Sequence, residues 1–379
     1  MRILFLAQRL PAPPNRGDRI PNYHFATQLA ARHEVLVGGF DDDGNGEAAA
    51  ETVKGMGARV AWESFTPGPR QIASGLRSLA NGRPVTVCHW RSRRIQAAVD
   101  EFVGQGCDVA YVYSSSMCRF LENHPRVPLC LNLAEMDSDK FRQYGEVRRG
   151  PMGWVYRREA RLLLEWERRW VPAAKTVLLI SEVEQALLKD RIPECDGLLL
   201  PNGVDLERFH PADPPTPEDP PLCVFTGVMD YEPNVDAVHW FADEILPLVR
   251  RTHPDAGFLI VGTRPVASVR DLAKRPGIEV TGKVDEVLPH LHRARVAVAP
   301  VRLARGLQNK VLEAFAAGVP VVTTPQAFQG VDAEHGEHCL VADAAESFAD
   351  AVASLLDDPL LAARLADAGR ARVEEAYRW

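Results

Sequence analysis

Short apolar segments alternate with helix-like segments along most of the 379-residue chain, and this alternation constrains the fold more than any other feature. In the first half, the strand-like segments lie at residues 3–6, 34–38, 58–62, 109–113, 129–133 and 176–180. Segments with helical periodicity lie between them, at 22–32, 93–104 and 154–170. Strands that are apolar throughout and alternate with helices are typical of parallel sheets covered on both faces. The sequence therefore predicts an α/β fold.

A proline-rich segment, DLERFHPADPPTPEDPPL, interrupts the alternation at 205–222 with six prolines in eighteen residues. Proline has no backbone N–H to donate, so this segment forms neither a helix nor a central strand. The alternation then restarts, with strand-like segments at 223–227, 258–262, 278–281 and 296–299. We therefore expect two doubly wound domains, 1–207 and 208–379, with a linker at about 205–221 and a ligand site between their sheets.

Composition and charge exclude several classes of protein. The formal net charge of −7 provides no excess of basic residues for general nucleic-acid binding, so we expect no nucleic-acid partner. The seven scattered cysteines include no C-x-x-C pair, which favours a reduced, cytoplasmic chain over a disulfide framework. No run approaches the roughly 20 apolar residues of a membrane span. The initial MRILFLA is too short for a signal sequence and fits a first buried strand.

The segment RLARGLQNKVLEAFAAGVPVVTT, at 302–324, predicts a loop, a helix and a buried strand. At 100° per residue, three apolar side chains share the side of the helix that faces the core: Val311, Leu312 and Phe315. Asn309, Lys310 and Glu313 lie on the opposite side. Lys310 and Glu313 are then either a solvated i, i+3 pair or part of an anion-binding site with Gly306 and the helix N-terminus.

Four stretches resemble the GT-B glycosyltransferases, in particular family 4 of the retaining enzymes (glycosyl transferases group 1). They are PNGVDLERFHP (201–211), TGVMDYEPNVDAVHWF (226–241), VTGKVDEVLPHLHRARVAVAP (280–300) and KVLEAFAAGVPVVTT (310–324). The amino half is matched more thinly, by PAPPNRGDR (11–19), NLAEMDSDK (132–140) and LISEVEQALL (179–188). These details most resemble bacterial exopolysaccharide sugar transferases associated with PEP-CTERM sorting systems.

The resemblance implies a GT-B fold, with an acceptor-binding N-terminal and a nucleotide-sugar-binding C-terminal Rossmann-like domain. It also implies transfer of a sugar from a nucleotide-sugar to a growing exopolysaccharide or lipid-linked glycan, with retention of configuration. Glu313 matches the glutamate that holds the ribose hydroxyls, and a carboxylate can accept from two vicinal hydroxyls. The other candidate donor contacts are Gly306, Asn309, Gly17, Gly227, Gly282 and Val284. Gly17 would let backbone amides approach the phosphates, although a plain turn glycine is the alternative.

The chain departs from the family pattern at two places. Many members carry a second glutamate eight positions before the first, where this chain has Arg305. Members often have an arginine and a lysine after the glycine that ends the first donor-domain strand, but residues 228–234 contain no cation. Arg305 and Lys310 flank the N-terminal end of the predicted helix, so we infer that they replace the missing pair as a diphosphate clamp. Two other cations are alternatives: Arg264 and Lys283.

Asp137 is the candidate catalytic acid of the amino half. It follows a buried strand, where the family often has a His or Asp near the reacting carbon, and could accept the acceptor's proton or orient the sugar. Asp139 and Glu135 compete for this role. The resemblance implies neither a metal nor another cofactor, because the nucleotide-sugar is a substrate. The HGEHC stretch at 335–339 has no partner cluster that would complete a metal site.

The segment from 140 to 175 contains ten Lys or Arg against four Glu, with Trp154, Trp166 and Trp170 interleaved. Basic residues with tryptophans suit an anionic membrane surface, which would present a lipid-linked acceptor on the inner face of the cytoplasmic membrane. Tryptophans at helical spacing are, however, more often part of a hydrophobic core. Both interpretations stay open at this point.

Two other functions are compatible with the same fold. One is a non-hydrolysing nucleotide-sugar epimerase, which normally needs a fuller set of acids and histidines near the cleft. The other is a non-catalytic binder of nucleotides or carbohydrates. A Rossmann dehydrogenase is disfavoured, because no G-x-G-x-x-G follows the first strand. Release of free nucleoside diphosphate would distinguish the transferase from the first two alternatives.

Overall fold

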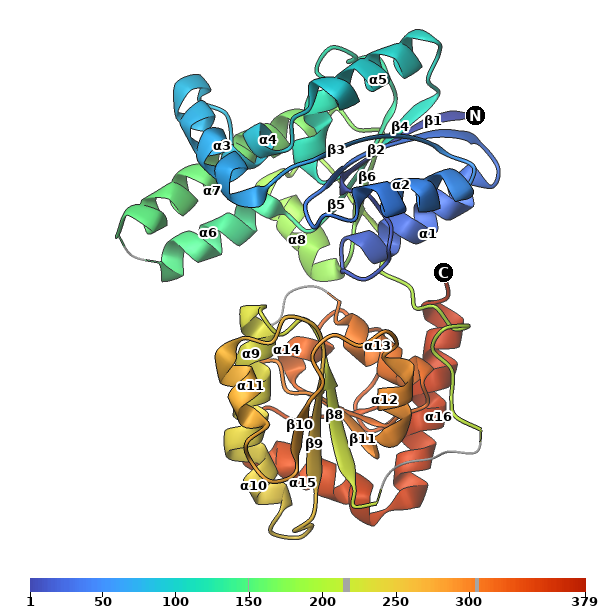
Figure 1. Ribbon diagram of the computed structural model, residues 1–379, viewed down its shortest axis with the longest axis vertical. Helices are drawn as coiled ribbons and strands as arrows, with labels where there is room; N and C mark the ends of the chain where they lie inside the picture. The colour runs from blue at the N-terminus through green and yellow to red at the C-terminus, as the bar shows by residue number, and fades with distance from the viewer. Residues whose placement is uncertain (149, 214–218, 304–306) are drawn as a thin grey trace. The chain divides into compact units, whose positions relative to one another are not determined.

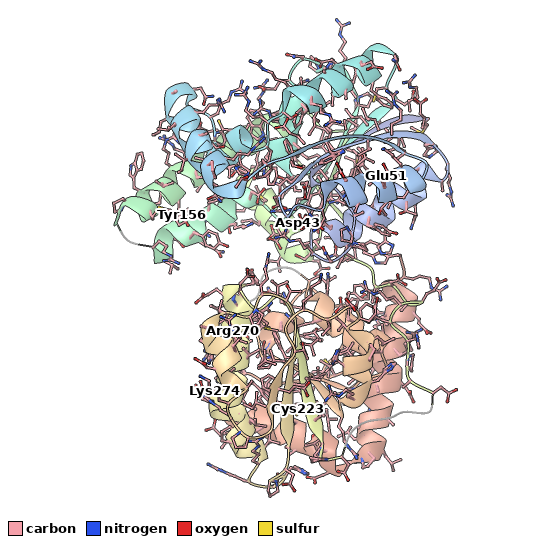
Figure 2. All side chains as sticks on the ribbon, viewed as in Figure 1. Asp43, Glu51, Tyr156, Cys223, Arg270 and Lys274 are labelled. Atoms are coloured by element: carbon pink, nitrogen blue, oxygen red, sulfur yellow. The ribbon has the colours of Figure 1, made fainter. Side chains whose placement is uncertain are left out.

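The computed structural model describes residues 1–148, 150–213, 219–303 and 307–379. The chain forms two compact units, Met1–Leu200 and Pro201–Trp379. Each unit is an α/β structure with its own parallel sheet (Figure 1; side chains are drawn in Figure 2).

The boundary between the units differs from the predicted boundary after residue 207. The residues before the proline-rich segment already pack on the C-terminal unit. The Asn202 amide donates to Asn309 Oδ1 at 3.1 Å, and Val204 forms an isolated parallel bridge with Arg378. Composition locates prolines but not these contacts, so it placed the boundary too late in the chain.

A parallel sheet of seven strands forms the centre of the N-terminal unit, in the order β3-β2-β1-β4-β5-β6-β7. The strands are β1 (Arg2–Arg9), β2 (Glu34–Asp41), β3 (Arg59–Ser64), β4 (Val109–Tyr113), β5 (Leu129–Ala134), β6 (Thr176–Leu179) and β7 (Leu198–Leu199). The strand order reverses between β1 and β4. Ligands of open α/β sheets bind beyond the carboxyl ends of the strands at such a switch point.

Alternate residues of β1 join two separate hydrophobic clusters. Leu4 and Leu6 belong to a cluster that includes residues of α4, α5, α7 and α8, whereas Ile3 and Phe5 belong to one that includes residues of α1 and α2. Helices therefore bury both faces of the sheet, which explains why its strands are apolar throughout. The helices are α1 (Arg19–Ala30), α2 (Gly46–Gly55), α3 (Pro67–Asn81), α4 (Val85–His89), α5 (Arg93–Gly104), the 3-10 helix η1 (Ser115–Leu121), α6 (Asp137–Val147), α7 (Gly150–Trp170) and α8 (Glu182–Arg191).

A parallel sheet of six strands forms the centre of the C-terminal unit, in the order β10-β9-β8-β11-β12-β13. Its strands are β8 (Leu222–Thr226), β9 (Gly257–Val261), β10 (Ile278–Val280), β11 (Val296–Ala299), β12 (Val321–Thr323) and β13 (Leu340–Val341). The switch point lies between β8 and β11. The helices are α9 (Glu232–Trp240), a π turn (Phe241–Ile245), α10 (Leu246–Val249), α11 (Ala267–Leu272), α12 (Leu288–Arg293), α13 (Asn309–Ala316), α14 (Pro325–Phe328), α15 (Ala345–Asp357) and α16 (Pro359–Ala376).

The three tryptophans of the basic segment have different surroundings. Trp166 and Trp170 are buried in the N-terminal core, and the Trp166 indole N–H donates to the Ser115 carbonyl at 2.8 Å. Trp154 is exposed, near the start of α7. The membrane interpretation of the first two is therefore wrong, because their helical spacing serves the core. Among the described helices, none is both long and apolar enough to cross a membrane.

Candidate functional site

Helix α13 presents the two candidate donor residues, Lys310 and Glu313, at the switch point of the C-terminal sheet. The predicted core face is confirmed, since α13 buries these apolar side chains: Val311, Leu312, Ala314, Phe315 and Ala316. Lys310 and Glu313 are half-buried on the other side. The helix ends before Gly318, whose φ of 67° lies in the left-handed region that favours glycine.

Lys310 crosses from α13 to the start of α9, which follows β8. Its Nζ donates to Asn234 Oδ1 at 3.1 Å and to Gln308 Oε1 at 3.2 Å, and it lies 4.9 Å from the centroid of the Phe225 ring. Burial lowers the pKa of Lys310 to about 8, although the nearby Glu313 carboxylate acts in the opposite direction. The ammonium is thus held by neutral oxygens and an aromatic face at a point where an anion would be stabilised.

Asn234 is a positioning residue that the sequence interpretation missed. Its side-chain amide donates to the Val228 carbonyl at 3.0 Å, which leaves its oxygen to accept from Lys310. It packs directly on Gly227, where a Cβ atom would lie 2.7 Å from Asn234 Nδ2. Gly227 also meets Gly262 at the end of β9, where a Cβ atom would lie 1.6 Å from the Gly227 carbonyl oxygen. Glycine is therefore required at 262, where backbone atoms occupy the space of a side chain, whereas a side chain at 227 would displace Asn234.

Glu313 is half-buried, on the side of α13 opposite the core. Among the residues that the structure describes, none donates a hydrogen bond to its carboxylate, and Lys310 forms no ion pair with it. Burial raises the pKa of Glu313 to about 7, while the positive charges of Arg208 and Lys310 act to lower it. A partly desolvated carboxylate without a donor is suited to accept hydroxyl groups of a ligand.

Three other donor candidates, Asn309, Gly282 and Val284, also lie in the C-terminal unit. Asn309 begins α13 and accepts the Asn202 amide, as described above. Gly282 and Val284 follow β10, and Gly282 has a φ of 70°, so a left-handed turn requires glycine there. Arg305 and Gly306 lie outside the described residues.

The two alternative cations are not equivalent. Arg264 forms an ion pair with Asp230, with Nε 2.9 Å from a carboxylate oxygen. Lys283 is exposed beyond β10. Lys310 differs from both, because it is half-buried and its partners are neutral.

In the N-terminal unit, Asp137 joins a polar cluster at the switch point between β1 and β4. Ser114, just after β4, donates to Asp137 Oδ2 at 3.1 Å. The amide of Gln8, near the end of β1, donates to the hydroxyls of Ser114 at 2.9 Å and Ser116 at 3.0 Å. Ser114 has a φ of 71°, which is a strained conformation for a non-glycine residue and is often found at functional sites. The sequence interpretation found Asp137 but missed Gln8 and Ser114.

Two buried glutamates hold the start of α6, which carries Asp137. Glu167 Oε1 accepts the backbone N–H of Ser138 at 3.1 Å, and Glu184 accepts that of Met136 at 2.9 Å. Burial raises the pKa of Glu167 to about 8, so this carboxyl is largely protonated at neutral pH. The competitor Asp139 is buried and accepts from Arg142 Nε at 2.7 Å. Asp137 is therefore better placed than Asp139 to contact a ligand.

Gly17 lies in an exposed turn before α1, and a Cβ atom there would meet nothing within 4 Å. Packing within the unit therefore does not require glycine at this position. Arg9 and Arg16, which both precede the turn, form ion pairs with Asp42, at 2.8 and 3.2 Å. Across the described parts of the chain, no group of three or more His, Cys, Asp or Glu side chains is arranged to hold a metal ion.

Solved structures with the same architecture identify the fold. Along its whole length the chain matches sucrose-phosphate synthase from Thermosynechococcus elongatus, with a TM-score of 0.74, 17% identity and 95% of that chain covered. It also matches HepE from Anabaena, solved in complex with UDP and glucose, with a TM-score of 0.67, 16% identity and 96% of that chain covered. The two parallel-sheet, Rossmann-like units thus have the GT-B glycosyltransferase fold, as the sequence predicted.

Sequence comparison adds a family match for the C-terminal unit. Residues 220–358 match the family described as Glycosyl transferases group 1, and this segment contains Lys310 and Glu313. The glycogen synthase of Mycobacterium tuberculosis is 34% identical over 212 residues, which cover 51% of this chain and 49% of the relative. A GDP-mannose-dependent monoacylated alpha-(1-6)-phosphatidylinositol monomannoside mannosyltransferase of Corynebacterium glutamicum is 31% identical over 204 residues, 48% of this chain and 52% of the relative. The chain spans about half the length of these curated relatives.

Proposed function

We propose that the protein is a glycosyltransferase that moves a sugar from a nucleotide-sugar to a glycan acceptor. One observation carries this proposal: at the switch point of the matched unit, α13 presents a cation with neutral partners and a carboxylate to which none of the described residues donates. A nucleoside diphosphate offers the complementary groups, namely phosphate oxygens for Lys310 and vicinal ribose hydroxyls for Glu313.

In this proposal Lys310 acts on the leaving group. The bond between the anomeric carbon and the diphosphate oxygen breaks, and the acceptor oxygen forms the new bond to that carbon. Negative charge grows on the departing diphosphate, so a cation fixed beside it lowers the barrier more than it tightens donor binding. Asn234 keeps the ammonium in place, because its own amide is anchored on the Val228 carbonyl.

The acceptor side of the proposal rests on the N-terminal unit. Asp137, fixed by Ser114, orients the acceptor hydroxyl. We assign the acceptor to lipid-linked glycans or a growing exopolysaccharide, with retention of configuration at the transferred sugar and no metal requirement. The name of the Corynebacterium relative, a phosphatidylinositol mannoside mannosyltransferase, supports a lipid-linked acceptor. Exposed apolar side chains around the start of α7 support peripheral contact with the inner face of the cytoplasmic membrane: Val147, Met152, Trp154 and Val155.

A donor panel tests the proposal. The melting temperature of the full chain is measured with UDP- and GDP-sugars, since ligands that bind the native state raise it. The donor that binds is then incubated with candidate acceptors, and free nucleoside diphosphate is measured. Release of diphosphate with a glycosidic product supports the transferase, and NMR of the product's anomeric centre tests retention. Binding without release would instead support the non-catalytic binder, and conversion of the donor sugar would support the epimerase.

A further inference from the structure

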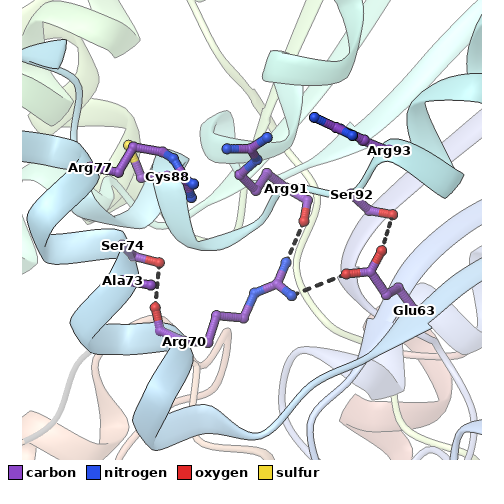
Figure 3. Close-up of a pocket in the computed structure, with 9 residues that line it drawn as sticks. All are labelled: Glu63, Arg70, Ala73, Ser74, Arg77, Cys88, Arg91, Ser92 and Arg93. Carbon is purple, nitrogen blue, oxygen red and sulfur yellow. Dashed lines mark hydrogen bonds and ion pairs between the residues drawn. The ribbon is translucent and has the colours of Figure 1, made fainter. Parts of the chain in front are cut away.

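A cavity in the N-terminal unit is lined by four arginines. It has a volume of about 450 Å³ and lies among α3, the end of β3, α4 and the start of α5 (Figure 3). The arginines are Arg70, Arg77, Arg91 and Arg93. Glu63 is the sole acidic residue among the nine described residues that line it. The lining therefore carries an excess of positive charge.

Arg70 and Glu63 are already engaged with each other and with the cavity wall. Arg70 donates to Glu63 at 3.2 Å, to the His89 carbonyl at 2.9 Å and to the Arg91 carbonyl. The second carboxylate oxygen of Glu63 accepts the Ser92 hydroxyl at 2.5 Å. These bonds fix the turn that carries Arg91, and they leave Glu63 little capacity to neutralise another cation.

The other three guanidinium groups are uncompensated. Within the described parts of the chain, Arg77, Arg91 and Arg93 form no ion pair. In the close-up, the guanidinium groups of Arg77 and Arg93 lie on either side of that of Arg91 (Figure 3). Three unpaired like charges around one cavity repel one another, and a bound anion would relieve this repulsion. Guanidinium groups also match phosphate oxygens in a bidentate geometry.

Two further features favour negative charge at the same place. Arg93 begins α5, whose first turn contains no acidic residue, so its charge opposes the helix dipole there. The pKa of the neighbouring His89 is lowered to about 4, first by burial and then by Arg70 and Arg9, which indicates a positive local potential. An anion in the cavity would offset the charge of Arg93 at the helix N-terminus and the part of the His89 pKa shift that Arg70 causes.

We infer that this cavity binds a phosphate or diphosphate group through Arg77, Arg91 and Arg93. The ligand is either a free phosphorylated molecule or the phosphate of a lipid. The two sides of helix α3 are compatible with either ligand. Its Arg70, Ser74 and Arg77 face the cavity, whereas its opposite side exposes three apolar side chains: Ile72, Leu76 and Leu79. The inference does not depend on the transferase activity proposed above.

The test uses the full chain with inorganic pyrophosphate as the probe. Calorimetric titrations are made in the Lys310→Met background, which removes the cation of the proposed donor site, and any binding that remains there is common to both variants compared. The cavity variant combines Arg77→Gln, Arg91→Gln and Arg93→Gln. The matched control removes the same charge from three exposed arginines outside the cavity: Arg32→Gln, Arg94→Gln and Arg126→Gln.

We expect saturable binding that weakens at least about tenfold in the cavity variant and less than about twofold in the control, because direct charge-assisted bonds are lost only in the former. Without pyrophosphate, the cavity variant should melt no lower than the control, since it loses repulsion rather than ion pairs. Absence of saturable binding, or equal loss in both variants, would overturn the inference.

Vesicles distinguish the two sources of the phosphate group. They consist of phosphatidylcholine with or without phosphatidic acid, and cosedimentation of each variant is measured. Binding to phosphatidic acid that is lost in the cavity variant, and kept in the control, identifies a lipid phosphate. Pyrophosphate binding without vesicle binding identifies a free phosphorylated ligand.

Discussion

Replacing Glu313 with Gln tests the ribose assignment with little change of shape. The carboxylate has no donor among the described residues and would accept two ribose hydroxyls. Glutamine keeps one acceptor oxygen, so the variant loses about one hydrogen bond to a charged group, worth about 1.5–3 kcal/mol. The dissociation constant of the nucleotide-sugar should therefore rise by roughly 10- to 100-fold.

The same variant has a second signature in its pH dependence. Burial raises the pKa of Glu313 from 4.5 to about 7, so the wild-type chain should bind the donor more tightly as the pH rises through about 7. Because the folded chain keeps this proton at pH values where the unfolded chain has released it, the Glu313 contribution to stability is lost as the pH rises from 4.5 to about 7. Above that range the Gln variant should be at least as stable as the wild type.

Isothermal titration calorimetry with the nucleotide-sugar, below and above pH 7, measures the first effect, and thermal melting measures the second. Glu337→Gln, at an exposed position of the same unit, is the control and should change neither. An unchanged dissociation constant in Glu313→Gln would refute the ribose assignment. A loss of stability above pH 7 would show that Glu313 has a structural role.

Four other substitutions test the remaining parts of the site. Lys310→Met should lower turnover by about 100-fold but donor affinity by less than tenfold, and equal losses of turnover and affinity in steady-state kinetics would contradict the assignment. Because burial lowers the pKa of Lys310 to about 8, wild-type turnover should also fall as the pH rises through about 8. Asp137→Asn should lower turnover without changing donor affinity in calorimetry. Weaker donor binding would indicate that Asp137 contacts the donor and not the acceptor. Gly17→Ala should leave the urea midpoint unchanged, because the site has room for a Cβ atom, and weaken donor binding; unchanged binding would make Gly17 a plain turn residue. Gly262→Ala should cost at least about 3 kcal/mol in urea denaturation, because a Cβ atom would lie 1.6 Å from the carbonyl oxygen of Gly227.

The central strands and α13 are predictable from sequence, because burial on both faces leaves a continuous apolar run and an amphipathic helix leaves a 3.6-residue period. The shortest strands, β7 (Leu198–Leu199) and β13 (Leu340–Val341), were not predicted. Two residues do not form a pattern. Helix α3 was also not predicted, although Ile72, Leu76 and Leu79 have helical spacing; in the structure these three side chains are exposed and do not belong to the core.

A site residue could be predicted only where the sequence immediately around it shows a recognisable pattern. Glu313 and Asp137 follow buried strands or lie opposite a core face, and both signals are local. Asn234, Gln8 and Ser114 have ordinary local sequence, and their roles arise from hydrogen bonds between segments that are far apart in the chain. Pairings of this kind are set by strand order, which one sequence does not reveal.

Lys310 and Glu313 do not form the solvated ion pair that their spacing allows. Residues three apart on an exposed helix face commonly form an ion pair, which adds only a few tenths of a kcal/mol. Here the ammonium instead donates to Asn234 and Gln308, and the carboxylate has no donor among the described residues. Burial lowers the pKa of Lys310 and raises that of Glu313, so burying these two charged groups lowers the stability of the fold. A solvated ion pair would not have this cost. We therefore propose that a ligand supplies the partners of both side chains: a diphosphate for the Lys310 ammonium and hydroxyl groups for the Glu313 carboxylate.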